Sequence, residues 1–111
     1  MNTTRAAIAT ALTTVSGIKG YAWRPRAIKA GDAWPLLGEI SRGPGRAWQV
    51  DWKVFVVLGN DEKAAADKAD ALIPDLCAAL DSTAFVDSAT PVTITTDAGD
   101  LYALELKARS E

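Results

Sequence analysis

Apolar residues occupy every second position from Trp48 to Leu58, a pattern typical of a strand with one buried face. The preceding segment from Ala33 can form a second strand, and the Gly-rich, basic tip at 41–46 suits a tight connection between the two. At ~3.4 Å per residue, a strand of about a dozen residues would run roughly 40 Å, whereas a domain of ~100 residues has a radius of gyration of only ~13 Å. The sequence therefore predicts a long β-hairpin that projects beyond the body of the domain.

A helix is predicted before this hairpin and another after it. Ile8, Leu12 and Val15 recur at helical spacing, which predicts a helix from about Thr4 to Val15 with Thr3 or Thr4 as its N-cap.

The second helix is expected to open at Asn60-Asp61-Glu62 and to run to about Leu80. Pro74 lies inside this helical pattern and has no N–H group to donate. We therefore expect a kink or a break near Ile73.

The remaining segments are predicted to be extended. Tyr21–Arg24, just before Pro25, suits a short strand at a sheet edge. A second hairpin is expected from 91–95 and 101–108, with a turn at 97–100. The order α-β-β-β-α-β-β predicts one α+β domain over residues 1–111, in which a mostly antiparallel sheet with a long projecting β-hairpin packs against two helices.

The long strand changes character along its length. Gln49, Asp51 and Lys53 are polar on the face opposite the tryptophans, whereas Phe55 and Val57 on that same face are apolar. This end of the strand should therefore be covered on both faces. The cover can come from a neighbouring subunit or from the same chain, and the pattern does not distinguish the two.

Composition argues against catalysis. The 111-residue chain has no histidine and a single cysteine, so the commonest general base and any cysteine-based zinc site are missing. The Gly43-Pro44-Gly45 loop joins two antiparallel strands and does not lead into a helix that could bind phosphate. We expect no enzyme activity and no catalytic, cofactor-binding or metal-binding residues.

Tryptophan and arginine gather in the first half of the chain. Both residue types are enriched at the energetic centres of protein interfaces. The candidate contact residues for a partner or a second subunit are Trp23, Arg24, Trp34, Arg42, Arg46 and Trp48. The alternative is that the tryptophans fill the core with arginines at its rim, which is the favoured reading for Trp52. Binding to nucleic acid would use the same residue types, but the net charge of −2 disfavours it.

No segment suggests a membrane or secreted protein. The N-terminal stretch lacks the apolar core and cleavage site of a signal peptide, and no run approaches the ~18 apolar residues of a membrane span. We expect a soluble protein made in the cytoplasm.

The order and spacing of several segments resemble one known family. They are the helix with Ile8 and Leu12 that ends in Val15-Ser16-Gly17-Ile18, GDAWP at 31–35, WQVDWKV at 48–54, Leu58-Gly59, ADALIPDL at 69–76, Ala79-Leu80 and YALEL at 102–106. In these features the chain resembles the tail terminator, or tail-completion, proteins of bacteriophages with long non-contractile tails.

The resemblance implies an α+β subunit of a hexameric ring at the head-proximal end of the virion tail. Such a ring stops polymerisation of the major tail tube protein and offers a surface to a head-completion or connector protein. DNA passes through its lumen without specific binding, and the family supplies no catalytic residues. Two alternatives remain: another connector or closure component of the phage neck, or a small ligand-binding α+β domain.

Overall fold

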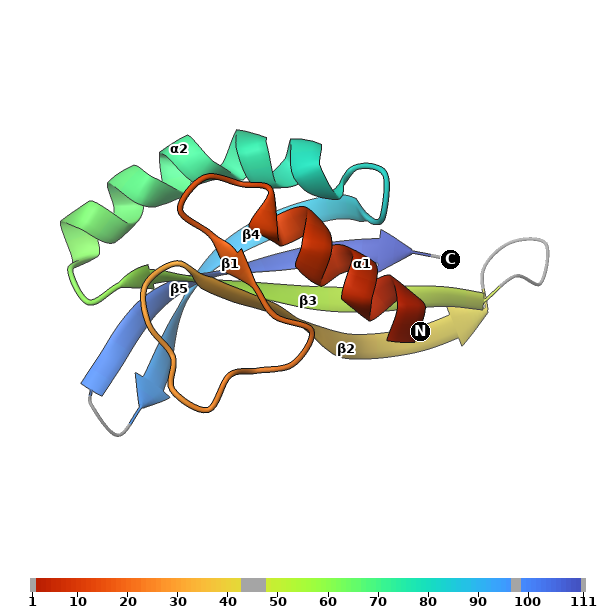
Figure 1. Ribbon diagram of the computed structural model, residues 1–111, viewed down its shortest axis with the longest axis horizontal. Coiled ribbons are helices and arrows are strands. Elements are labelled where there is room, and N and C mark those ends of the chain that lie inside the picture. Colours follow the sequence, from red (N-terminus) through yellow and green to blue (C-terminus); the bar gives the residue numbers. More distant parts are fainter. Residues whose placement is uncertain (1, 43–47, 97–98, 111) are drawn as a thin grey trace.

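The computed structural model describes residues 2–42, 48–96 and 99–110, which form two helices and five strands (Figure 1). In chain order the elements are helix α1 (Asn2–Thr13), strands β1 (Lys19–Gly20), β2 (Asp32–Arg42) and β3 (Trp48–Gly59), helix α2 (Glu62–Leu80), and strands β4 (Phe85–Thr96) and β5 (Gly99–Ser110). This order confirms the prediction α-β-β-β-α-β-β.

The strands lie side by side in the order β1-β2-β3-β5-β4. Strand β1 runs parallel to β2, and all other neighbours in the sheet are antiparallel. Strands β2 and β3 form one hairpin and β4 and β5 the other, and α2 connects them. The mostly antiparallel α+β fold predicted from the sequence is confirmed.

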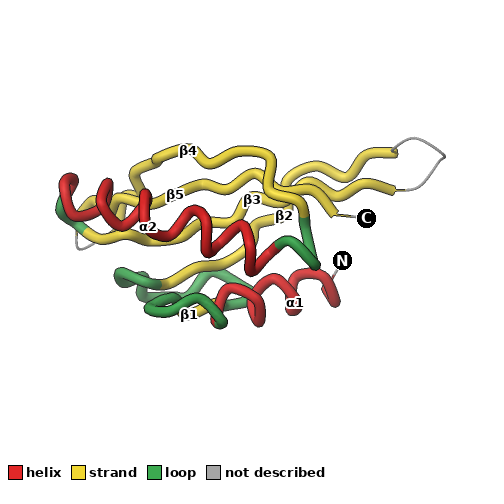
Figure 2. Tube along the Cα trace, turned by 90° about the horizontal axis from the view of Figure 1, so that it is seen from above, coloured by secondary structure: helices red, strands yellow, loops and turns green. Residues whose placement is uncertain are grey.

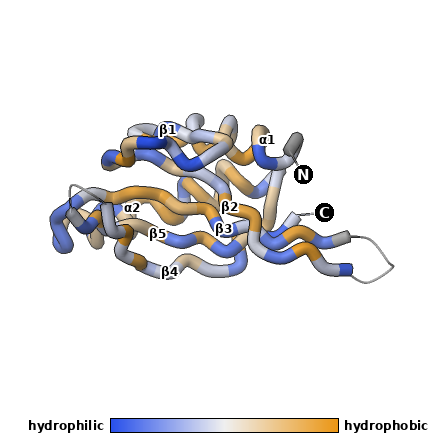
Figure 3. Tube along the Cα trace, turned by 90° about the horizontal axis from the view of Figure 1, so that it is seen from below, coloured by the Kyte–Doolittle hydropathy of each residue, from blue (hydrophilic) through white to orange (hydrophobic). Residues whose placement is uncertain are grey.

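Both helices lie on the same face of the sheet, as seen from above in Figure 2. Buried side chains from both helices and from β2, β3 and β5 form one apolar core between the layers. The opposite face of the sheet is directly visible in Figure 3, and no described helix covers it. The molecule is therefore a two-layer structure with one covered and one uncovered sheet face.

Helix α1 lies unusually close to the sheet edge. A Cβ atom at Gly20 would collide with the backbone carbonyl oxygen of Ala9, so only glycine permits this approach. The Gly20 N–H group donates a hydrogen bond to Thr13 Oγ1 at 3.0 Å. The predicted apolar stripe is confirmed, because Ile8 and Leu12 are buried in the core.

The bounds of α1 differ from the prediction. The helix begins at Asn2, so Thr3 and Thr4 lie within it and are not its N-cap. After Thr13 the chain continues as a tight turn, in which the Val15 N–H donates to the Leu12 carbonyl at 3.1 Å.

Helix α2 begins as predicted, because the Asp61 side chain accepts a hydrogen bond from the Ala64 N–H at 2.9 Å. Of the predicted kink or break near Ile73, the break is wrong: the helix runs uninterrupted from Glu62 to Leu80 with Pro74 inside it. Pro74 lies on the exposed side, where water can bind the carbonyl that lacks its helical donor.

The short strand lies earlier than predicted. Tyr21–Arg24 is not a strand, because β1 consists of Lys19 and Gly20 alone. The chain then leaves the sheet edge and returns at Asp32, and we call residues 21–31 the edge loop. Strand β4 is longer than predicted, since it begins at Phe85.

The two hairpins project from opposite ends of the sheet (Figure 1). Strands β3 and β5 pair only as far as Val50 with Ser110, and beyond this pair β3 has β2 as its partner. At the other end β5 pairs with β3 no further than Tyr102, and beyond it the tip of the β4–β5 hairpin extends alone. The projecting first hairpin is confirmed, and the second projection was not predicted.

The body itself is elongated, with extents of 45 × 27 × 21 Å and a radius of gyration of 13.7 Å. The long strand therefore lies along the length of the molecule, and only its end extends past the sheet. A strand of this length would extend further from a spherical body. The observed projection is therefore shorter than the one predicted from the sequence.

Candidate interaction surface

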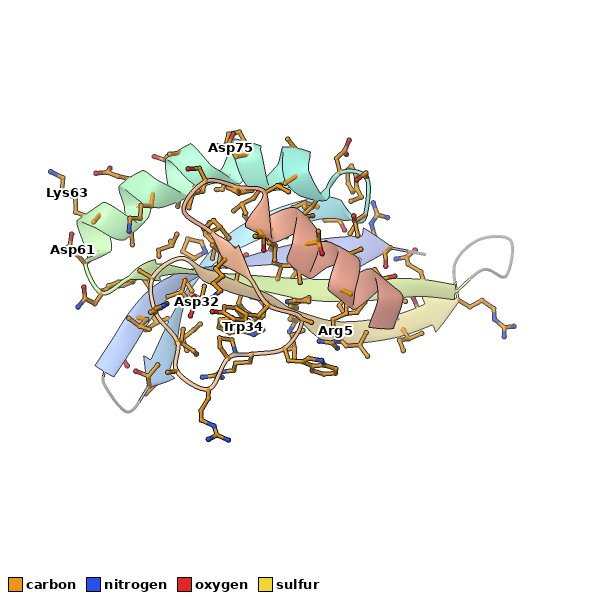
Figure 4. All side chains as sticks on the ribbon, in the orientation of Figure 1. Arg5, Asp32, Trp34, Asp61, Lys63 and Asp75 are labelled. Carbon is orange, nitrogen blue, oxygen red and sulfur yellow. The ribbon has the colours of Figure 1, made fainter. Side chains whose placement is uncertain are left out.

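Arg5 of α1 lies between two tryptophan rings. Its guanidinium carbon is 3.8 Å from the ring centroid of Trp23 and 5.3 Å from that of Trp52. Trp52 is a core residue with 1% of its surface exposed, as predicted, whereas Trp23 in the edge loop is 64% exposed. Figure 4 shows Arg5 beneath α1 beside strand β2. This arginine thus connects a core ring to a surface ring.

Arg5 also completes the outer edge of the sheet. The N–H groups of Lys19 and Tyr21 donate to two backbone carbonyls along this edge, each at 2.8 Å. At the carbonyl of Pro35, two residues further along β2, the donor is Arg5 Nη1 at 3.1 Å. The same nitrogen donates to the Ala22 carbonyl at 3.2 Å. The side chain takes the place of a further strand residue, which explains why β1 ends at Gly20.

The buried charge of Arg5 is compensated without a carboxylate. Only 7% of the residue is exposed, and among the described residues no acid forms an ion pair with it. Its Nε has no hydrogen-bond acceptor in the described structure. Burial of a cation is costly, and here two carbonyls and two aromatic faces offset that cost. Arg5 is therefore one of the contacts that position the edge loop, together with the backbone N–H groups of Tyr21 and Gly31, which donate to carbonyls of β2 and β3.

Trp34 lies on the sheet face away from the helices. It is 3% exposed and stacks on Phe55, with 5.7 Å between ring centroids. The Arg24 guanidinium carbon lies 5.8 Å from the Trp34 ring centroid. Val57 on the same face is also buried within the subunit. Side chains of the same chain thus cover this end of β3, which answers the question that the sequence left open.

The predicted contact residues do not form one patch in the described structure. Trp23, Arg24 and Trp34 lie in or beneath the edge loop, whereas Arg42 is exposed at the far end of β2. The eight residue steps from Trp34 to Arg42 along the strand correspond to roughly 27 Å.

Arg46 and the Trp48 side chain lie outside the described residues. Because Trp34 is buried, its ring offers almost no surface to a partner in this conformation. Contact of the remaining residues with a partner stays a prediction.

Segment 19–31, which comprises β1 and the edge loop, and helix α2 carry opposite charges; the first lies at the β1–β2 edge of the sheet and α2 lies over the helix-covered face (Figures 1 and 4). Segment 19–31 has no acidic residue and four exposed bases: Lys19, Arg24, Arg26 and Lys29. Segment 61–81 has two lysines, Lys63 and Lys68, and six exposed acids: Asp61, Glu62, Asp67, Asp70, Asp75 and Asp81. The near-neutral net charge of the chain conceals this polarity.

A groove of about 360 Å³ lies between the N-terminal half of α2 and the second hairpin. Its lining is mostly apolar, and Glu62 supplies a carboxylate. The lining includes Ala65, Ala66, Ala69, Pro91, Val92 and Tyr102. In the sequence the alanines form part of a helical stripe. Nothing there indicates that the flank of α2 that faces the second hairpin stays partly open. We call this feature the alanine groove.

A larger hollow of about 650 Å³ lies on the uncovered sheet face near the first hairpin. Two ion pairs involve its lining: Lys53 Nζ lies 3.7 Å from Glu105 Oε1, and Arg109 Nε lies 2.9 Å from Asp87 Oδ2. In exposed ion pairs of this kind the two charges offset each other, and the two pairs do not gather their charge at one position for a ligand. In the described part of the chain, no group of three or more His, Cys, Asp or Glu could hold a metal ion.

Comparison with models of protein families gives no match, and no curated protein is similar enough in sequence to be a relative. Neither described helix has both the length and the apolar character that crossing a membrane requires.

Proposed function

We propose that this chain is a structural subunit of a bacteriophage tail. In this proposal it forms a ring that caps the tail tube, stops polymerisation of the tube protein and presents a surface for joining to the head. The sequence resemblance suggests this role, and one feature of the architecture supports it.

That feature is the pair of hairpins at opposite ends of an elongated subunit (Figure 1). A protein between the tube and the head must bind a different partner at each end. Projecting hairpins expose backbone and side chains beyond the sheet, which suits contact with separate partners. The long sides of the subunit remain for contact with its neighbours in a ring.

The proposal is tested by shortening each hairpin separately. One variant replaces residues 42–46 with a two-residue turn, and the other deletes Thr95, Thr96, Gly99 and Asp100 and keeps the turn between them. Each variant should stay folded, because the tips lie beyond the region where β3 and β5 pair. We expect one variant to lose control of tube length in electron micrographs. The other should still cap tubes but fail to join heads.

Two results would contradict the proposal. If the wild-type protein leaves the length distribution of growing tubes unchanged, it is not a tube terminator. If it joins heads without limiting tube length, the neck-connector alternative replaces it.

A further inference from the structure

We propose that neighbouring copies of this chain bind head to tail, with Trp23 and the edge loop of one copy seated in the alanine groove of the next. This inference rests on the proposed ring and specifies its lateral contact.

Trp23 has the properties of an interface anchor. Its ring is 64% exposed, yet it lies 3.8 Å from the guanidinium carbon of Arg5. Two hydrogen bonds to backbone carbonyls hold that guanidinium in place. An exposed aromatic ring that is already held in position loses little conformational freedom on binding, which favours affinity. The indole is therefore preorganised for contact.

The alanine groove matches this anchor in size and character. Its volume of about 360 Å³ falls within the range of about 300–1,000 Å³ that is typical of ligand pockets, which is enough space for an indole ring. Small side chains such as Ala66 leave the space open, and the apolar lining would gain from exclusion of water. A groove of this kind on a long side of the subunit is available to a second copy.

Charge complementarity identifies the occupant as another copy of the chain. Arg24 and Arg26 flank Trp23, whereas Glu62 lines the groove and Asp70 lies on the next helical turn after Ala66. Opposite charges around an apolar contact favour the correct orientation and faster association. The edge loop follows β1 at one edge of the sheet, whereas the groove is lined by α2, β4 and β5 toward the other edge, so the two can meet only between two molecules.

Two different surfaces in contact make a heterologous interface. Such an interface leaves one free loop and one free groove on every dimer, so assembly continues until the chain of subunits closes. A closed ring is the expected end state. This geometry covers part of the second hairpin but leaves the projecting end of each hairpin free for the tube and the head.

The first experiment fills the groove. Ala66→Arg places a long basic side chain in the space proposed for the indole, and Ala66 is exposed on α2, so the fold should be unaffected. Ala78→Arg is the matched control, because Ala78 is exposed on the same helix but does not line the groove. We expect Ala66→Arg to raise the protein concentration needed for assembly by about tenfold or more, as judged by light scattering, and Ala78→Arg to match wild type.

The second experiment mixes two variants that each lose one surface. Trp23→Ser keeps its groove, and Ala66→Arg keeps its tryptophan, so neither should assemble alone. Their mixture has one intact interface and should form a 1:1 dimer that grows no further. A thermal unfolding curve for each variant shows that the monomers are folded.

Assembly of Ala66→Arg at the wild-type concentration would overturn the inference, as would a mixture that contains only monomers. Both experiments are repeated with tube protein present. The tube-length assay then separates failure of the lateral contact from failure of the proposed function. If wild type limits tube length and Ala66→Arg does so equally well, the lateral contact is wrong and the function stands. If wild type neither assembles nor limits tube length, both are wrong.

Discussion

The two long sides of this molecule are built by different means. The α2 side is held by apolar packing, with Leu76 and Leu80 fully buried against the sheet. The edge-loop side is held largely by polar contacts. Arg5 bonds two carbonyls and lies against two rings, and the backbone N–H groups of Tyr21 and Gly31 donate to carbonyls of β2 and β3. Local changes can therefore loosen the loop while the sheet stays folded, whereas changes beneath α2 act on the whole domain. The proposed lateral contact joins the α2 side of one copy to the edge-loop side of the next.

The largest effect should follow from a change on the α2 side. Leu76→Ala removes a fully buried side chain and leaves a cavity between α2 and the sheet. Changes of this type lower the free energy of unfolding by about 2–5 kcal/mol. Chemical denaturation should show this loss with a single transition for all probes. A loss confined to the edge loop would contradict the division between the two sides.

A smaller and more local effect is expected for Arg5→Met. Methionine retains an unbranched apolar stem but leaves the carbonyls of Pro35 and Ala22 without their donor. The loss of these bonds should cost about 1–3 kcal/mol. Hydrogen exchange should accelerate at Tyr21, whose N–H is bonded along this edge. Exchange in β5 should change little, and equal acceleration in both places would argue against a separately adjustable loop.

The smallest loss of stability is expected when the N-cap contact at the start of α2 is removed. Asp61→Ala removes the side chain that accepts from the Ala64 N–H. Loss of an N-cap typically costs about 1 kcal/mol. Asp67→Ala is the control, because Asp67 is exposed within the same helix and makes no described hydrogen bond. A similar loss of stability in both variants would show that net charge, and not the cap, accounts for the effect.

Features with a local cause could be predicted from the sequence. The alternation from Trp48 to Leu58 predicted β3, and the Asn60-Asp61 pair predicted the start of α2. Of the kink or break predicted at Pro74, the break was wrong because the cost of a proline depends on which side of the helix faces water, which tertiary packing decides. The early end of β1 has a distant cause, since Arg5 is 30 positions away from Pro35 in the chain.

The candidate surface was only partly visible in the sequence. Residue type identified Trp23 and Arg24, which lie in the edge loop, but the same criterion selected Trp34, which is buried. The alanine groove has no signature in residue type, because alanine is common on helices. It arises from the space between α2 and the second hairpin, which only the fold defines.

Native mass spectrometry of the wild-type protein, alone and with tube protein, tests the central claim most directly. A head-to-tail contact that closes into a ring predicts one dominant closed species, expected to be hexameric, and smaller intermediates of every size on dilution. Ala66→Arg should shift this distribution to monomers. A dimer that never grows, and that Ala66→Arg leaves intact, would contradict the account.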